Sequence, residues 1–210
     1  MAQMGRPRTF DRDAAITKAM HLFWEHGYES TSLSQLKASI GGGISAPSFY
    51  AAFGSKEALF QEVVSHYLAT HGRVTECLWD ADLPPREAIE LALRRSAKMQ
   101  CERGHPKGCM VALGVMTACS PGNATILKPL TESRGRTRAG IVACIERGIA
   151  NSDLPADTDV HPMAAVFDSF LTGLSTLVRD GIRHLVLDAA VTRVMAIWDD
   201  AAAPGVQTSR

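Results

Sequence analysis

The stretch that decides the fold is residues 43–59, which read GISAPSFYAAFGSKEAL. Ser45 predicts an N-cap, because its hydroxyl can accept a hydrogen bond from a free amide of the first helical turn, where Pro47 is tolerated. Ser55 repeats this signal and caps a helix that continues toward Trp79. The stretch therefore predicts two consecutive helices, the first of them short.

The residues before this stretch predict two more helices. Asp11 is placed to cap the first one, whose apolar stripe ends at Gly27. Ser32 and Gln35 form a capping box, in which each side chain satisfies a free backbone N–H group of the other residue. A second helix is therefore expected over about 33–40, and three consecutive glycines then break the chain.

Two short helices joined by a glycine-containing turn are typical of a helix-turn-helix, whose second helix enters the major groove of DNA. The helix that begins at Ser45 is the candidate reader, because small side chains near its N-terminus permit close approach to base edges. Residues 1–56 carry six basic and four acidic side chains. The phenol of Tyr50, the ammonium of Lys56 and the hydroxyl of Thr31 can hold phosphates. The candidate DNA-contacting residues are Thr31, Ser45, Ala46, Ser48, Tyr50 and Lys56.

The rest of the chain has apolar residues at three- and four-residue steps and lacks alternating strand patterns, so the chain is predicted to be all-α. Proline and glycine clusters separate the expected helices. A polar linker over 151–159 precedes the last two of them. The expected ranges are about 85–102, 109–119, 120–149, 160–180 and 185–202.

The composition narrows the class of protein. The 210 residues include 22 basic and 22 acidic side chains and are 46% hydrophobic, which excludes general disorder and a wholly basic DNA-coating protein. We find no run of about 18 apolar residues and no secretory signal, so no membrane association is expected. Five cysteines, an odd number, favour a reducing compartment. We expect the protein in the cytoplasm.

The N-terminal segment resembles the DNA-binding domain of TetR-family transcriptional regulators. The resemblance runs from about residue 5 to 60 and rests on Gly5-Arg6-Pro7-Arg8, Ala19 to Gly27-Tyr28, Thr31-Ser32-Leu33 and the stretch quoted above. It implies a nine-helix fold, with a helix-turn-helix DNA-binding domain over 1–55 and a ligand-binding and dimerisation domain over 56–210. It also implies a homodimeric repressor that leaves a palindromic double-stranded operator when a small-molecule inducer enters a chamber in the second domain.

The same resemblance implies that the last two helices form the dimer interface. Two reading helices related by the dimer axis would then lie about 34 to 36 Å apart, which is one turn of DNA. The apolar stripes of the last two helices supply the candidate interface residues, which are Phe167, Phe170, Leu174, Leu177, Val191, Val194 and Trp198.

The glycine turn departs from the family pattern. Gly41-Gly42-Gly43 precede Ile44 where the family usually has a single glycine, so two residues look inserted. Extra glycines lose entropy on ordering and loosen the angle between helices. Lys37 also stands where the family commonly has a small residue, and we interpret it as a solvated side chain.

Methionines in the second half of the chain favour an adaptable apolar cavity, because flexible thioethers line such cavities well. Core filling explains each methionine equally well, and both interpretations stay open. The candidate lining residues are Trp79, Met99, Met110, Met116, Phe167 and Phe170.

Cys109 is the candidate reactive thiol. It follows Gly108 at an expected helix start, where the helix dipole and Lys107 would stabilise a thiolate. Some TetR-like regulators that sense electrophiles or oxidants carry a similar Gly-Cys, so the resemblance offers redox sensing as an alternative to a buried, inert thiol. Cys101, His105 and Cys109 are metal-binding residue types, but glycine and proline interrupt the helix and no fourth ligand follows, so no metal site is expected.

Other functions have less support in the sequence. Gly41, Gly43 and Ala46 match a dinucleotide-binding fingerprint, but that fingerprint follows a strand, and a helix is expected here. We find no nucleophile elbow, zinc-binding helix motif or P-loop, so neither an enzymatic activity nor a cofactor is expected. A ligand-binding helical protein with impaired DNA binding is a further alternative, because of the glycine insertion.

Overall fold

Helices form all the regular structure in the part of the chain that is described. The computed structural model describes residues 11–116 and 121–202, and the side chains of residues 115, 116 and 121 lie outside that description. Nine α-helices and three 3-10 segments occur in the described ranges, with no strand among them. The all-α fold class predicted from the sequence is confirmed.

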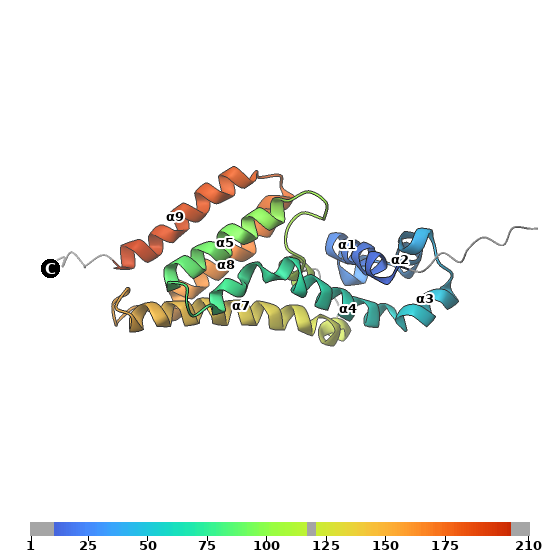
Figure 1. Ribbon diagram of the computed structural model, residues 1–210, viewed down its shortest axis with the longest axis horizontal. Coiled ribbons are helices and arrows are strands. Elements are labelled where there is room, and N and C mark those ends of the chain that lie inside the picture. The colour runs from blue at the N-terminus through green and yellow to red at the C-terminus, as the bar shows by residue number, and fades with distance from the viewer. Residues whose placement is uncertain (1–10, 117–120, 203–210) are drawn as a thin grey trace, which may run out of the picture.

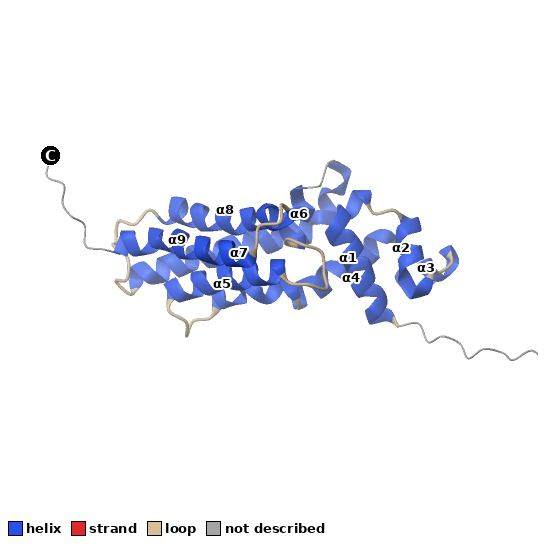
Figure 2. Ribbon diagram, turned by 90° about the horizontal axis from the view of Figure 1, so that it is seen from above, coloured by secondary structure: helices blue, strands red, loops and turns tan. Residues whose placement is uncertain are grey.

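The molecule is elongated, with its N-terminal helices at one end (Figure 1). α1 (Arg12–Ser30), α2 (Leu33–Ser39) and α3 (Ala46–Phe53) gather there, and we call them the head. α4 (Lys56–Ala69) runs from the head into the remaining helices, which we call the body. Within the body, α5, α7, α8 and α9 lie side by side (Figure 2).

Local capping explains where the head helices begin. Asp11 accepts a hydrogen bond from an amide of the first turn of α1 (3.0 Å), and Ser32 and Gln35 form the predicted capping box at α2. Ser45 Oγ accepts a hydrogen bond from Ser48 N (3.2 Å) and begins α3. Each cap satisfies an N–H group that the first turn leaves free, as the sequence predicts.

The triple-glycine turn between α2 and α3 has a defined geometry. Glycines 41–43 have φ values of +60°, +80° and +104°, which other residues rarely adopt. Hydrogen bonds from Gly43 N to Ile40 O (2.8 Å) and from Ile44 N to Lys37 O (3.0 Å) close the turn. The extra glycines therefore supply a left-handed backbone that the turn requires, whereas the sequence suggests a loosened connection.

Two expected helices are interrupted. Gly27 has φ +78° and ψ 169°, so α1 breaks where its end is predicted, although one more helical turn follows. α4 ends at Ala69 because Thr70 leaves the helical conformation (φ −119°, ψ −91°), and the 3-10 segment η2 (His71–Trp79) follows. The prediction of one continuous helix from Ser55 toward Trp79 is therefore wrong beyond Ala69.

The body helices agree closely with their expected ranges, apart from the end of α6 and the start of α7. The expected end of α6 at Cys119 lies outside the described residues. No helix within the described ranges is long and apolar enough to cross a membrane. The body elements are α5 (Pro85–Cys101), α6 (Met110–Met116), η3 (Pro121–Asn123), α7 (Ala124–Ala150), α8 (Val160–Arg179) and α9 (His184–Ala202).

One apolar cluster joins the head to the body. It includes Phe23 of α1, Leu59 of α4, Met110 of α6 and Leu130 of α7, each at most 1% exposed. A second cluster fills the space among α5, α7, α8 and α9. Burial of apolar surface is the main stabilising term in folding, so moving the head away from the body is opposed by the first cluster. The domain boundary at residue 55 stays a prediction, and a continuous core crosses it.

Candidate DNA-binding surface and ligand cavity

The N-terminal end of α3 faces solvent. Two buried phenylalanines on the opposite side of the helix anchor it to the head. Ser45 and Ser48 are exposed and their hydroxyls are hydrogen-bonded at 2.9 Å. Tyr50 is 50% exposed, and Ala46 is partly exposed. Four of the six predicted DNA-contacting residues therefore share one accessible surface.

Thr31 is turned inward and does not belong to this surface. It is 0% exposed, and its hydroxyl donates to Gly27 O (2.7 Å) and approaches Leu22 O (3.3 Å). The prediction that this side chain contacts a phosphate is wrong for this structure, because the hydroxyl stabilises the break in α1.

Aromatic rings hold two cations of the head. Lys56 Nζ lies 4.3 Å from the ring centroid of Tyr28, and burial lowers the pKa of this ammonium group. Arg12 lies 5.0 Å over the ring of Phe53 and donates to both carboxylate oxygens of Glu62 (3.1 and 2.7 Å). Arg12 is thus engaged in joining α1 to α4, whereas Lys56 stays a candidate for a phosphate contact.

A cluster of rings joins α1 to the body, and we call it the ring joint. It consists of Trp24 of α1, Tyr67 of α4, His71 of η2 and His105 of the loop before α6. The ring of Trp24 stacks on His105 with centroids 4.6 Å apart and meets Tyr67 edge-on at 4.9 Å. Arg179, at the end of α8, donates to Trp24 O (3.0 Å). The orientation of α1 is therefore fixed by groups from α4, η2, the loop before α6 and α8.

Histidines crowd the ring joint. Burial lowers the pKa of His71, and the nearby His105, His21 and His66 lower it further, while Glu102 acts in the opposite direction. Burial, and then His105, lower the pKa of His21. The folded protein therefore favours the neutral imidazoles, because a positive charge there is both desolvated and repelled.

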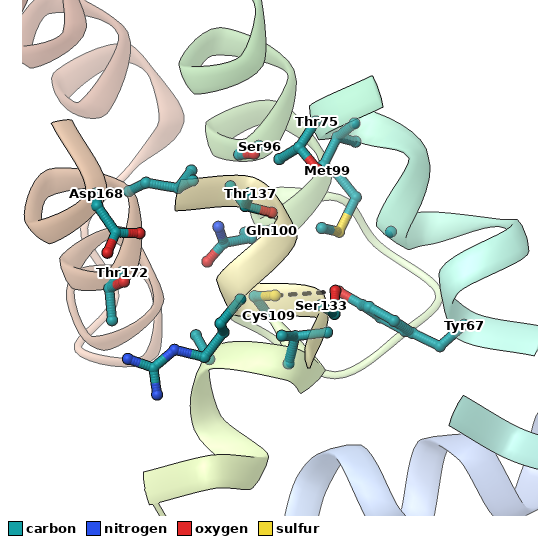
Figure 3. Close-up of a pocket in the computed structure, with 16 residues that line it drawn as sticks. Tyr67, Thr75, Ser96, Met99, Gln100, Cys109, Ser133, Thr137, Asp168 and Thr172 are labelled. Carbon is teal, nitrogen blue, oxygen red and sulfur yellow. Dashed lines mark hydrogen bonds between the residues drawn. The ribbon is translucent and has the colours of Figure 1, made fainter. Parts of the chain in front are cut away.

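A cavity that is partly open to solvent lies among α4, η2, α5, α6, α7 and α8. Figure 3 shows Asp168 and Thr172 on one side of it and Tyr67 on the other, with Gln100 between them. Met99 is the predicted lining residue that the structure places here. A cavity that combines apolar walls with convergent polar groups is typical of a small-molecule site.

The other predicted lining residues lie elsewhere or are not described. Met110 and Phe167 are at most 1% exposed and belong to the core clusters. Phe170 packs between body helices, and Trp79 is 43% exposed and lines a separate groove. The side chain of Met116 lies outside the described residues. The core-filling interpretation is therefore correct for Met110, and placing Phe167 in the cavity is wrong.

Cys109 lines the cavity. Its Sγ accepts a hydrogen bond from Tyr67 Oη (3.3 Å), and its backbone N donates to Ser175 Oγ (3.3 Å). Burial raises the pKa of the Tyr67 phenol well above its usual value, so the phenol keeps its proton. Gly108 has φ +86°, and a Cβ there would lie 2.7 Å from Leu113 Cδ1 and 3.2 Å from Ser175 O. The glycine before Cys109 is thus required by the backbone.

Cys101, His105 and Cys109 do not converge on one point. His105 Nδ1 is hydrogen-bonded to Pro106 O (2.8 Å), and Cys109 is engaged with Tyr67. Among the described residues, no group of three His, Cys, Asp or Glu side chains could hold a metal ion.

Sequence reasoning missed the polar residues of the cavity. Ser96 and Gln100 are 2% and 1% exposed, and they lie one turn apart on the apolar stripe of α5. Ser175 is 0% exposed on the inner face of α8. Such residues need hydrogen-bond partners. Polar residues at positions that the helical period assigns to the core are the signal that could have found them.

The last two helices carry an inner and an outer apolar face. The inner face fills the core of one protomer, so predicting it as a dimer contact is wrong. The predicted interface residues that belong to it and are at most 2% exposed are Phe167, Leu174, Val191 and Trp198. Phe170 and Val194 are partly buried against the same core.

The outer face remains open in one protomer. Leu177 belongs to it and is 40% exposed, so it stays a candidate interface residue. The other members of this face are not among the predicted interface residues. They are 37% to 75% exposed and comprise Val166, Leu185, Val186 and Ile197 of the two helices and Ile182 of the loop between them.

Known proteins resemble this chain in sequence. The family described as "Bacterial regulatory proteins, tetR family" matches residues 15–63. The HTH-type transcriptional repressor ComR of Escherichia coli (strain K12) is 29% identical over 197 residues, which cover 93% of this chain and 92% of ComR. The HTH-type transcriptional repressor BdcR of the same strain is 35% identical over 111 residues, which cover 53% of this chain and 55% of BdcR.

The structure also resembles a DNA-bound one. A cysteine mutant of the TetR family transcriptional regulator CifR, complexed with 26-base-pair double-strand operator DNA, is 38% identical and gives a TM-score of 0.81. The match covers 92% of this chain and 100% of that chain. The likeness therefore includes both the head and the body.

We expect acid to destabilise the ring joint. The pKa values of His21 and His71 are lowered from 6.5, so the unfolded chain binds more protons and this contribution to stability is fully present above pH 6.5. It is lost as the pH falls from 6.5 toward the lowered values. The calorimetric melting temperature should therefore decrease as the pH falls from about 8 to 5.5, and this decrease should be smaller in His71→Gln.

His161, exposed on α8, provides the matched control, because His161→Gln leaves the joint intact. This variant should keep the full pH dependence of the wild type. A melting temperature that is equally pH-dependent in His71→Gln and the wild type would contradict the role of the joint.

Proposed function

The chain belongs to the TetR family and is a DNA-binding transcriptional regulator, and from this premise we propose that it is a homodimeric repressor, released from a palindromic operator by a small-molecule inducer. The observation that carries the proposal is the exposed N-terminal end of α3, on a chain similar over its length to an operator-bound regulator. We assign it no enzymatic activity, since its relatives are regulators. We place it in the cytoplasm, where bacterial operator DNA lies.

α3 is suited to the major groove. The exposed Ser45 and Ser48 and the partly exposed Ala46 are small, so the helix can approach base edges closely and offer hydroxyl and methyl contacts. Tyr50 and Lys56 flank this end and supply a phenol and an ammonium for phosphates. We assign base recognition to the small residues at the start of α3. We assign the positioning of this helix on the DNA backbone to Tyr50 and Lys56.

The outer apolar face of α8 and α9 supports the dimer. Val166, Leu177 and Leu185 are 41%, 40% and 75% exposed in the single protomer. Several large apolar side chains left exposed on neighbouring helices are typical of a protein contact. A second copy seated there by a twofold axis buries these residues and sets the spacing of the two α3 helices.

The cavity is connected to the head through direct contacts. Tyr67 lines the cavity and also meets Trp24 of α1 in the ring joint. A ligand that moves Tyr67 or the loop carrying His105 therefore shifts the surface on which α1 rests. A ten- to hundredfold preference of the inducer for the DNA-free arrangement corresponds to about 1.4 to 2.8 kcal/mol.

Thiol sensing through Cys109 is a second candidate function. Cys109 Sγ lines the cavity and accepts a hydrogen bond from Tyr67. Burial raises the pKa of Cys77, Cys101 and Cys144. Among the described cysteines, Cys109 is the one that lines this cavity, where an electrophile can reach it.

Lys56→Gln should weaken binding to all DNA sequences and reduce the salt slope by about one unit per protomer, because one phosphate contact is lost. Ser48→Ala should keep the salt slope and change the preferred bases. Fluorescence anisotropy with labelled duplexes at several salt concentrations measures both effects. Lys128→Gln, on α7 in the body, is the matched charge control. If Lys56→Gln leaves the salt dependence of DNA affinity unchanged, Lys56 does not contact a phosphate.

Leu177→Asp should convert the dimer to monomers, because an unpaired carboxylate is costly to bury at an interface. A loss of about 2 kcal/mol or more is expected for a central contact. Sedimentation velocity measures the change, and Ala139→Asp on an exposed position of α7 is the control. Since Leu177 is 40% exposed, the protomer should stay folded by circular dichroism. A Leu177→Asp dimer as tight as the wild type would refute this interface.

N-ethylmaleimide should lower operator affinity if Cys109 is the sensing thiol. The Sγ–H proton leaves, an Sγ–C bond forms across the maleimide double bond, and the other carbon takes up a proton. The bulky adduct pushes against Tyr67 and hence against the ring joint. Cys109→Ser should be resistant, whereas Cys101→Ser should respond like the wild type. Equal loss of affinity in Cys109→Ser would end this second candidate.

A further inference from the structure

A chain of hydrogen bonds fixes the amide of Gln100. Cys109 N donates to Ser175 Oγ (3.3 Å), and Ser175 Oγ donates to Gln100 Oε1 (2.8 Å). Gln100 is 1% exposed and Ser175 is 0% exposed, so neither group is free to turn toward bulk water. With Oε1 occupied, the Nε2 group of Gln100 has no acceptor among the described residues and lines the cavity. Its two N–H groups are therefore available to donate to water or to a ligand in this partly open cavity.

The charges around the cavity leave one cation uncompensated. Asp168 lines the cavity with its side chain 14% exposed, and its Oδ2 accepts a hydrogen bond from Arg138 Nε (2.7 Å). Arg134 also lines the cavity and has no ion pair within the described ranges. Arg138 thus offsets Asp168, and the guanidinium of Arg134 stays available. Its planar fork matches a carboxylate, which it can bind with two parallel hydrogen bonds.

The remaining wall is partly apolar. Val74, Met99, Val111 and Leu171 line the cavity beside these polar groups. A ligand that fits both parts has an anionic head and an apolar body. A dianion such as a phosphate fits less well, because its second charge would have no partner and would face Asp168.

We infer that this cavity takes a small organic monocarboxylate, whose oxygens accept from Gln100 Nε2 and Arg134 and whose apolar body packs on Met99 and Leu171. The inference names the ligand class of the inducer site proposed above, and the regulatory role of that ligand rests on the proposed function. The preference for a carboxylate over a neutral isostere can be tested separately from DNA release.

The test compares isosteric pairs, benzoate with benzamide and hexanoate with hexanamide, by isothermal titration calorimetry on the full chain. Each acid should bind at least about tenfold more tightly than its amide, because hydrogen bonds to a charged group are the stronger ones. Arg134→Gln should remove most of this difference. Arg136→Gln, at an exposed position of α7 paired with Glu76, should keep it.

Gln100→Glu provides a sharper variant. It keeps the oxygen that accepts from Ser175 and replaces the free amide with a negative group. Benzoate binding should fall by at least about tenfold, whereas benzamide binding should be retained or improved, because its NH₂ group can donate to the new carboxylate. A merely damaged cavity would lose both ligands, so the reversal of preference separates recognition from misfolding.

The inference is supported if the acid binds more tightly than the amide in both pairs and Gln100→Glu reverses this preference. If benzoate then leaves operator affinity unchanged, the inducer proposal fails but the inference stands. Amides that bind as tightly as the acids, or acids that all bind more weakly than about 1 mM, overturn the inference whatever the DNA assay shows.

Discussion

The contact between Trp24 and the body is the constraint on which the rest of the structure depends. Trp24 is 2% exposed, stacks on His105 and meets Tyr67 edge-on, while Arg179 holds its main-chain oxygen. Because α2 and α3 are short, they cannot set their own position relative to a second protomer. Their position follows from α1, and α1 is positioned by these rings and by the apolar cluster beneath them. A reading helix can select a sequence only if this chain of contacts is stiff.

In the proposed mechanism, the same contacts make the head responsive to a ligand. Tyr67 belongs to both the ring joint and the cavity. Its hydroxyl donates a hydrogen bond to Sγ of Cys109, which follows His105 closely in the chain. A small displacement in the cavity therefore reaches Trp24 through one aromatic side chain, and no long pathway is needed. The lowered pKa of His71 fits this role, since this imidazole packs in the joint in its neutral form. In this proposal, tight packing of the head against the body and sensitivity to a ligand arise from one set of residues.

The sequence predicts the parts of this structure that depend on local chemistry. The caps at Asp11, Ser32 and Ser45 are hydrogen bonds within one turn, so residue types at fixed spacing are sufficient to find them. Three features depend on packing between distant segments and are not predicted. The hydroxyl of Thr31 turns inward because α1 breaks beside it. Phe167 and Val166 are neighbours on a helix that is apolar on two faces, and the helical period does not say which one meets the core. The orientation of the Gln100 amide is set by Ser175, 75 residues away in the chain.

The central claim is that two copies of α3, held at a fixed spacing through the body, read adjacent major grooves. The most direct measurement is enrichment of bound sequences from a randomised duplex pool, followed by sequencing. The account predicts an inverted repeat whose half-sites are about 10 to 10.5 base pairs apart, or a multiple of that spacing. A single half-site without its inverted partner, or no enrichment over the starting pool, would contradict it.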